Sequence, residues 1–432
     1  MEMQTIICLV VFAGTLIAFA LNRLPIALTA MLGMTVMVLT GCLKPAEAAA
    51  ALSSSTVVQL GSMFVLAGAF GRTRAIGKLA KCVSNISRGS SVGMIAAYVV
   101  LAAVLQNFVG SAVATFTMLY PLMLACCKEL RISPSKVMLP VGMVCICCGS
   151  TLPTSGAVNM IAVLRGYLET YGMHEYADIP LLRWSLARLP AFLVMIVYSI
   201  FVTPKFLPDR IDIESLVVEE QRERAKDKAL TEFQERATLI IFVVALLAII
   251  LNKRIGIPGW QSAFVGALLV VAIGTLRGKE LWNSMGLNMI FLYVGTNGIA
   301  TALSATGAAD IVGNTLTGVF GNHPNGYLVG FVFFLVPFLL TQIMSNAAVN
   351  FIFTPITIMC MQSLGANPVG PCILVIIAAL SSFMTPMATP AVPVIMSAGG
   401  YTQMDIFKAS VIPSVLLCLS SVLWIMTLFP LY

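Results

Sequence analysis

Uncharged runs of about twenty apolar residues recur along this 432-residue chain. A helix needs about 20 apolar residues to cross a bilayer, and only helices and closed barrels satisfy every backbone polar group inside lipid. Charged residues make up 10% of the chain, against about 25% in soluble domains. The sequence therefore predicts an all-α polytopic protein that passes several times through the lipid bilayer of the cell (inner) membrane.

The predicted spans form two sets of similar plan. The first set, in residues 1–204, has spans near 4–20, 25–43, 56–70 and 185–204, a hairpin near 93–127, and a broken helix near 137–171 that is interrupted at 149–156. The second set, in residues 237–432, has spans near 238–251, 259–276, 287–302 and 410–430, a hairpin near 327–361, and a broken helix near 370–397. Residues 205–236, rich in both charges and helix formers, are predicted to be a cytoplasmic, partly helical linker. We interpret it as a plain connector in preference to a regulatory element.

Polar clusters interrupt the apolar runs at positions that recur 234 residues apart. Residues 345–355 (SNAAVNFIFTP) share Ser, Ala and Pro with 111–121 (SAVATFTMLYP), and 385–395 (TPMATPAVPVI) share Thr, Ala-Val and Ile with 151–161 (TLPTSGAVNMI). Unpaired polar groups are costly in hydrocarbon, so these breaks must face protein, water or a ligand. Two matched breaks in each of two halves are typical of a carrier with its site between inverted repeats.

The charge pattern predicts the orientation. Each half crosses five times and has a re-entrant hairpin that does not change sides, so the second repeat is inverted. The loop 71–91 contains five basic residues, and its counterpart 303–326 contains none. An internal linker and external termini place most Lys and Arg in the cytoplasm, as the positive-inside rule requires. The basic residues that this orientation places on the external side of the membrane are Lys44, Arg165, Arg183, Arg188, Lys253 and Arg254.

The breaks suggest the chemistry of a binding site. Interrupted helices present free N–H groups and a positive dipole end, and Ser, Thr and Asn add neutral donors, so an anion can bind without Lys or Arg. Freed carbonyl and hydroxyl oxygens can hold a sodium ion beside it. The predicted substrate-binding residues are Ser345, Asn346, Ala347, Ala388, Thr389, Pro390, Ser155, Gly156 and Asn159. The predicted sodium ligands are Ser111, Thr151, Ser345, Asn346 and Thr385. The alternative is that these small residues only allow close helix packing.

The absence of acidic residues from the predicted membrane core points to the coupling ion. Proton-coupled carriers usually contain a titratable group there, whereas sodium needs only neutral oxygens. We therefore expect Na⁺ as the coupling ion and no cofactor. The eleven cysteines have no histidine partners and are interpreted as apolar core residues rather than a metal site. The net charge of +7 does not indicate nucleic acid, because the basic residues lie between spans.

Four stretches resemble the divalent anion/sodium symporter family of the ion transporter superfamily. They are NRLPIALTAMLGMTVMVLTGCLKPAEA at 22–48, LRISPSKVMLPVG at 130–142, SNAAV at 345–349 and ATPAV at 388–392. Members of this family carry dicarboxylates, citrate or sulfate. The resemblance implies a homodimer that works by an elevator motion of the hairpin-bearing domain.

The resemblance also implies roles for the hairpin tips and the breaks. In the family, a Ser-Asn-Thr triplet at each tip helps to bind sodium and the substrate carboxylates. Here the triplets are Ser345-Asn346-Ala347 and Ser111-Ala112-Val113. The family's Gly-Thr-Pro-Pro-Asn pattern becomes residues 388–392, and its first-half counterpart matches only through Asn159. These departures leave fewer donors for a substrate carboxylate.

Together these features predict a secondary active transporter that imports a small organic or inorganic anion with Na⁺ by an elevator-type alternating-access mechanism. The alternative is a carrier of the same superfamily with another role, such as arsenite-type anion efflux or cation/proton antiport. An intramembrane enzyme is not expected, because the chain has neither HExxH, GxGD nor a Ser–His pair at membrane depth. Paired breaks in inverted repeats favour a carrier over a channel.

Overall fold

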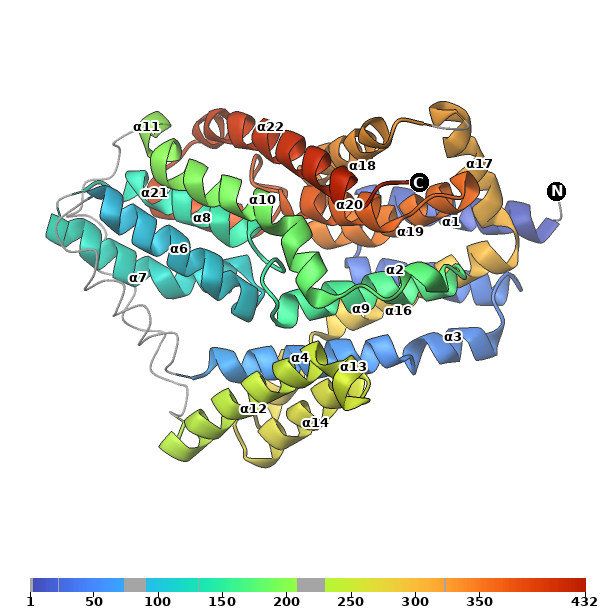
Figure 1. Cartoon of the computed structure of the whole chain (residues 1–432), viewed down its shortest axis with the longest axis horizontal. Coiled ribbons are helices and arrows are strands. Elements are labelled where there is room, and N and C mark those ends of the chain that lie inside the picture. The colour runs from blue at the N-terminus through green and yellow to red at the C-terminus, as the bar shows by residue number, and fades with distance from the viewer. Residues whose placement is uncertain (1–2, 22, 74–90, 131, 208–229, 322–323) are drawn as a thin grey trace.

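The computed structural model describes residues 3–21, 23–73, 91–130, 132–207, 230–321 and 324–432 (Figure 1). Helices and loops account for all of these residues. Among them, seven helices are long and apolar enough to cross a membrane, and seven further apolar helices are shorter. The prediction of an all-helical, multi-pass membrane protein is confirmed.

The first half contains the predicted spans, a hairpin and a broken helix. Its elements are α1 (Met3–Leu21), α2 (Ile26–Leu39), α3 (Pro45–Leu52), α4 (Ser55–Gly71), α6 (Ser91–Val109), α7 (Ala112–Leu130), η1 (Pro134–Lys136), α8 (Met138–Cys147), α9 (Ser155–Thr170), η2 (His174–Tyr176), α10 (Leu181–Phe201) and α11 (Thr203–Phe206). The hairpin arms α6 and α7 each have 19 residues, which is longer than predicted because both helices extend into the polar segments at their bases.

The second half repeats this order. Its elements are α12 (Glu232–Ile250), α13 (Asn252–Ile255), α14 (Gly259–Ala272), α15 (Lys279–Ser284), α16 (Leu287–Ala305), α17 (Ala308–Phe320), α18 (Gly326–Thr341), α19 (Asn346–Leu364), α20 (Val369–Leu380), α21 (Ala391–Gly399) and α22 (Gln403–Leu428). Helix α17 lies where a polar connection was predicted. Helix α12 begins inside the predicted linker, because Thr231 and Gln234 form a capping box. Helix α11 ends inside the same linker, whose residues 208–229 lie outside the described residues, as does most of the basic loop 71–91.

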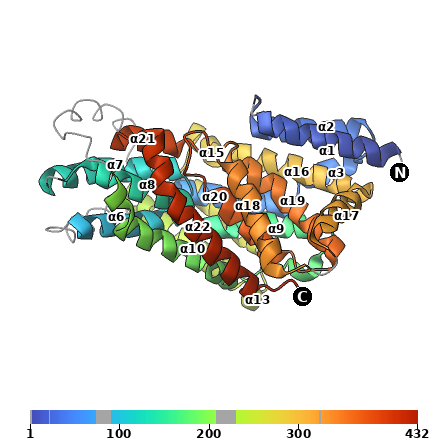
Figure 2. The same cartoon turned by 90° about the horizontal axis from the view of Figure 1, so that it is seen from above.

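The two hairpins approach each other from opposite ends of the molecule. Figures 1 and 2 both show α6 and α7 toward the left, with α18 and α19 farther right. The broken helices run between them: α8 packs against α21, and α9 packs against α19. This arrangement brings both hairpin tips and both helix breaks to the middle of the molecule.

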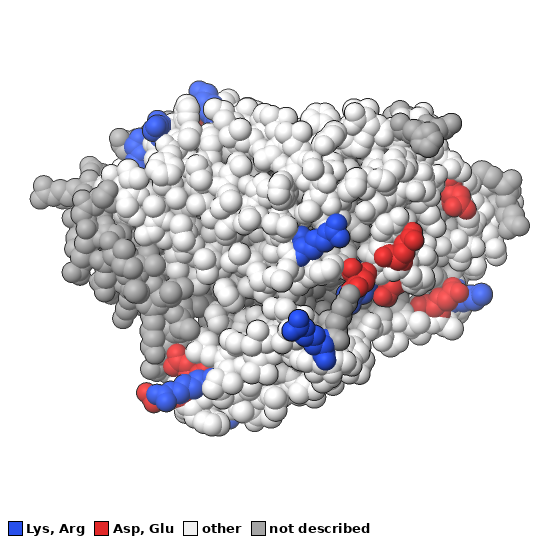
Figure 3. Space-filling view, in the orientation of Figure 1, with Lys and Arg blue, Asp and Glu red and all other residues white. Residues whose placement is uncertain are grey.

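Helices α10 and α22 pack together and form an apolar outer face. Figure 3 shows few charged side chains over this region. The exposed side chains on α10 follow one helical stripe: Leu182, Leu186, Leu189, Leu193 and Val197. A broad exposed apolar face is typical of helices that contact lipid.

A proline helps to join α10 to α22. Pro190 lies inside α10 and has no N–H group, so the Leu186 carbonyl loses its helical donor. The Trp424 indole of α22 donates to that carbonyl at 2.9 Å. The carbonyl that Pro190 leaves without a helical donor therefore forms a hydrogen bond between α10 and α22, the last spans of the two halves.

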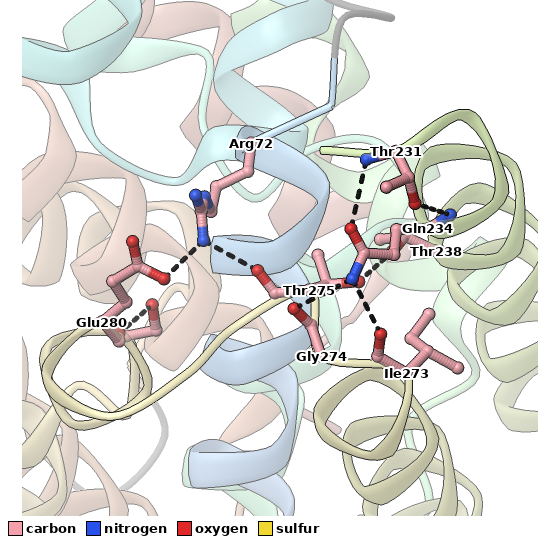
Figure 4. A network of polar contacts seen from close by, with 9 residues as sticks. Arg72, Thr231, Gln234, Thr238, Ile273, Gly274, Thr275 and Glu280 are labelled. Atoms are coloured by element: carbon pink, nitrogen blue, oxygen red, sulfur yellow. Dashed lines mark hydrogen bonds and ion pairs between the residues drawn. The ribbon is translucent and has the colours of Figure 1, made fainter. Parts of the chain in front are cut away.

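A polar network ties α4, α12 and α14 together at one end (Figure 4). Arg72, which follows α4, donates to the Thr275 carbonyl at 2.8 Å and pairs with Glu280 at 2.5 Å. The Thr238 and Thr275 hydroxyls lie 2.7 Å apart, and Gln234 donates to the loop after α14. These contacts fix the start of α12 beside the end of α4.

Candidate functional site

A cavity of about 360 Å³ lies where the hairpin tips and helix breaks meet. The first half contributes Gly110 and Ala112 from its hairpin tip and Gly149 and Ser150 from its break. The second half contributes the tip residues Ser345, Asn346 and Ala347 and the break residues Ala388, Thr389 and Pro390. Ile26 of α2, Met160 of α9 and Met289 of α16 complete part of the wall. Tips and breaks from both halves therefore line one cavity.

The second half supplies most of the predicted residues that reach this cavity. All six of its predicted substrate-binding residues, in 345–347 and 388–390, line the wall. The three from the first half, Ser155, Gly156 and Asn159, lie in α9 and are absent from the wall. Of the predicted sodium ligands, Ser345 and Asn346 line the cavity, whereas Ser111, Thr151 and Thr385 lie beside it in the tip and the breaks.

The first break explains why α9 begins beyond the cavity. Helix α8 ends at Cys147, and the chain turns through Ser150, which has a φ of 57°. This left-handed conformation is strained for a residue with a Cβ atom. Gly156 packs behind the turn, where an added Cβ would come within 3.0 Å of the Ser150 hydroxyl. Gly156 therefore shapes the break instead of lining the site.

The hairpin-tip serines cap helices. The Ser345 hydroxyl accepts a hydrogen bond from the Ala348 N–H at 3.2 Å, and the Ser111 hydroxyl accepts one from the Ala114 N–H at 3.3 Å. Such caps satisfy orphan N–H groups in the first turn. The serine that recurs 234 residues apart therefore starts the second arm of each hairpin.

One side-chain amide in each half clamps a hairpin to its break. Asn107 donates to the Cys148 carbonyl at 2.9 Å, and its oxygen accepts from the Thr151 and Leu152 N–H groups at 2.7 and 2.8 Å. Gln342 donates to the Ser381 carbonyl at 3.1 Å and accepts from the Met384 N–H at 3.1 Å. Both amides also donate to the carbonyl one turn earlier in their own helix.

Threonine hydroxyls complete these two clamps. Thr154 donates to the Asn107 carbonyl at 2.5 Å, and Thr385 donates to the Gln342 carbonyl. The predicted sodium ligand Thr385 thus uses its hydroxyl hydrogen within the protein, which leaves the oxygen lone pairs to act as acceptors.

Three buried or half-buried amides offer donors to the cavity. The Gln106 oxygen accepts from the Thr115 hydroxyl at 2.8 Å, and its nitrogen has no partner among the described residues. Asn350 accepts from Thr354 at 3.1 Å, and its nitrogen reaches only the Met160 sulfur at 3.8 Å. The Asn346 amide lies 3.4 Å from the Thr341 hydroxyl, whose hydrogen is donated to the Ala379 carbonyl at 2.9 Å. The orientations of the Gln106 and Asn350 side-chain amides are assigned from these hydrogen-bond partners.

Gln106 and Asn350 were not among the predicted site residues. Both lie in the interrupted segments, and a polar amide within an apolar helix is the signal that identifies them. Among the described residues that line the cavity, none is charged. The N-terminal ends of α7 and α19 reach it through Ala112 and Asn346, and Pro390 immediately precedes α21. Neutral donors and positive helix ends thus create a wall suited to an anion.

Arg188 lies inside the predicted span 185–204, and its side chain is buried against the first break. Its helix begins at Leu181, four residues before the predicted start of that span. The guanidinium donates to the Gly149 carbonyl at 3.0 Å. The assignment of Arg188 to the external side of the membrane stays a prediction.

Two family models match overlapping parts of the chain. Residues 16–262 match the model described as citrate transporter, and residues 172–431 match the sodium:sulfate symporter transmembrane region. Each match covers more than half of the sequence. The chain belongs to the divalent anion/sodium symporter family.

Several curated proteins are similar to this symporter-family chain. An uncharacterized transporter of Synechocystis is 30% identical over 45% of the chain and 32% of its own length. An uncharacterized transporter of Escherichia coli is 26% identical over 44% of the chain and 31% of its own length. The chain thus spans about a third of these two relatives. The sodium-dependent dicarboxylate transporter SdcS of Staphylococcus saprophyticus is 20% identical over 88% of the chain and 77% of its length.

Two solved structures share the fold. The YdaH transporter of Alcanivorax borkumensis has a TM-score of 0.61 at 10% identity and covers 92% of this chain and 90% of its own. The Neisseria gonorrhoeae protein MtrF has a TM-score of 0.63 at 14% identity and covers 98% of this chain and 94% of its own. At these identities the likeness concerns the fold alone. The family descriptions and relatives' names are those of transporters and not of enzymes, as the sequence predicted.

Proposed function

We propose that this protein is a secondary active transporter that imports a small anion together with Na⁺. The observation that carries the proposal is the uncharged cavity between the two hairpin tips, with amide donors from Gln106, Asn346 and Asn350. Neutral donors and helix N-termini stabilise an anion without holding it as tightly as a fixed cation. A carrier needs this balance, because it must release its substrate in every cycle.

The substrate class follows from the donors and from the relatives. The matched family models are described as a citrate transporter and a sodium:sulfate symporter, and SdcS is described as a sodium-dependent dicarboxylate transporter. The volume of about 360 Å³ is sufficient for an anion of that size. Ala112 and Ala347 replace family donors at the tips, while Gln106 adds an amide on the first-half side. We therefore propose a small oxyanion or carboxylate that is held by amides more than by hydroxyls.

The oxygens of the second break are the proposed sodium ligands. Unwound carbonyls and the C-terminal ends of half-helices bind Na⁺ in carriers with broken helices. Helix α20 ends at Leu380, and Ser381, Ser382 and Thr385 supply hydroxyl oxygens within the next five residues. A sodium ion held by these oxygens would offset the charge of the anion.

The proposed mechanism is alternating access by an elevator motion. The hairpins, broken helices, α10 and α22 pack on one another, and α2, α4, α12, α14 and α16 form a second set of packed helices. The cavity lies partly between these sets, with Ile26 and Met289 on the second. Sliding of the first set along the second would move the bound anion across the membrane. The homodimer is carried over from the family as part of this proposal.

Two measurements test the function. Thermal shifts of the purified protein across a panel of sulfate, citrate and dicarboxylates, with and without Na⁺, should identify an anion whose stabilisation requires Na⁺. Uptake of that anion into proteoliposomes should require an inward Na⁺ gradient and persist when the pH gradient is collapsed. Equal uptake in sodium and choline buffers would refute the sodium coupling. Sodium-independent loss of anion from preloaded vesicles would instead support the efflux alternative.

A further inference from the structure

Arg188 is a buried arginine within the hairpin-bearing set of helices. It lies about two turns inside α10 and is 2% exposed. Its Nη2 donates to the Gly149 carbonyl at 3.0 Å, and its Nε lies 3.4 Å from the Thr151 hydroxyl. Its Nη1 has no hydrogen-bond partner in the part of the chain that the structure describes. Within that part, no carboxylate forms an ion pair with it.

The end of the half-helix α8 offsets part of this charge. Helix α8 ends at Cys147, and the Gly149 carbonyl just beyond it accepts from the guanidinium. The C-terminal end of a helix carries about half a negative charge. The backbone therefore lowers the cost of burying a charge that has no carboxylate partner among the described residues.

The oxygens that contact Arg188 are of the kind that can also coordinate a sodium ion. Half-helix C-terminal ends and freed carbonyls hold Na⁺ where helices are broken. In the first break, the Gly149 carbonyl and the Thr151 hydroxyl have this character, but the guanidinium already contacts both. A sodium ion at this place would meet a fixed positive charge.

The second break has the same kind of oxygens, and no Lys or Arg side chain among the described residues donates a hydrogen bond to them. Ser382 is fully buried, and its hydroxyl has no partner among the described residues. The counterpart of α10 in the second half, α22, contains one basic residue, Lys408, which is exposed near its start. The two halves therefore differ in charge at the place where their structures correspond.

We propose that the Arg188 guanidinium is a fixed cation that replaces one coupling sodium ion in the first half of the protein. The carrier then takes up sodium only at the second break. This inference rests on the proposed sodium-coupled transport. Arg188 remains in the protein when the empty carrier returns, so its charge makes no net movement across the membrane. Each substrate is therefore transported with one cation fewer than in a carrier with two sodium sites.

The test compares sodium stoichiometry in wild type, Arg188→Gln and Arg188→Lys, using the full chain and radioactive Na⁺ as the probe. Arg188→Gln should bind one sodium ion more than wild type, and its melting temperature should rise with NaCl but not with choline chloride. Arg188→Lys should resemble wild type because it keeps the charge. In proteoliposomes, the reversal potential of Arg188→Gln should correspond to one more positive charge per substrate.

Several results would overturn the inference. One is an unchanged sodium stoichiometry in Arg188→Gln, and another is lost anion affinity without any change in sodium dependence, since Arg188 would then serve the anion. Arg188→Met provides a second neutral variant, and failure of both variants to fold even in high sodium would also contradict the proposal. If the wild-type protein binds no Na⁺, the sodium coupling itself is refuted. The role of Arg188 is decided separately, by the difference in bound sodium ions between Arg188→Gln and wild type.

Discussion

Individual polar residues decide what the cavity can bind. Side-chain amides from both halves face an otherwise apolar wall, and the hydroxyls of Ser111 and Ser345 are already used as helix caps. An amide donor left unpaired in a buried site costs roughly 1–3 kcal/mol, so each amide has a measurable share in ligand affinity. Gln106 is the amide whose donor is most clearly available on the first-half side.

Changing Gln106 should therefore weaken anion binding. We expect Gln106→Leu to reduce affinity roughly tenfold, because a donor is lost from the cavity. Gln106→Glu should reduce it further, because a carboxylate repels the anion. Binding assays by thermal shift or calorimetry check both, with Gln261→Leu, an exposed position on α14, as the matched control. Wild-type affinity in Gln106→Glu would exclude this residue from the site.

At this scale the sequence predicted much of the cavity wall, but not all of it. Ser345, Asn346 and Thr389 were found because polar residues in an apolar run need a partner. Gln106 lies within the predicted hairpin 93–127 and was not among the predicted site residues. The place of Arg188 beside the first break was not predicted, because it depends on the packing of α10 against that break, which hydropathy does not reveal.

At the scale of helices, the breaks depend on the two amide clamps. Asn107 and Gln342 bridge the last carbonyl of one half-helix and the first N–H groups of the break. The clamps coincide with both breaks. The second break begins at Ser381, four residues before the segment predicted from residue 385, where Gln342 holds the Ser381 carbonyl.

Removing a clamp should loosen its break. We expect Asn107→Ala to destabilise the protein by about 1–3 kcal/mol, and by more than Gln342→Ala, because Asn107 accepts from two N–H groups. Melting temperature and hydrogen exchange at the Thr151 and Leu152 amides measure the effect. Asn288→Ala, at an exposed position on α16, is the control. Unchanged exchange at both amides in Asn107→Ala would contradict the clamp.

At the scale of the whole molecule, the sequence predicted the helical plan and the hairpin-and-break order of both halves. It did not predict α17, because short amphipathic helices resemble polar loops in composition. The inverted repeat and the orientation stay predictions. They agree with hairpins that enter from opposite ends, and with α11 and the start of α12, which flank the linker, at the left of Figure 1.

The orientation can be measured directly. Gln221 lies in the linker predicted to be cytoplasmic, outside the described residues. In a background without the native cysteines, Gln221→Cys should react with an impermeant thiol reagent only after cells are opened, and a cysteine near either terminus should react in intact cells. Labelling of Gln221→Cys in intact cells would reverse the proposed topology.

The central claim is that the cavity between the hairpin tips is the transport site, and Asn346→Ala tests it most directly. Asn346 lies at the N-terminal end of α19, half-buried in the cavity wall. The variant should bind the anion at least roughly tenfold more weakly and lose Na⁺-driven uptake, since one amide donor is removed. Its melting temperature should stay near that of wild type. The control Asn314→Ala changes an exposed position on α17 and should keep wild-type anion affinity, uptake and melting temperature. Normal uptake and affinity in Asn346→Ala would contradict the claim.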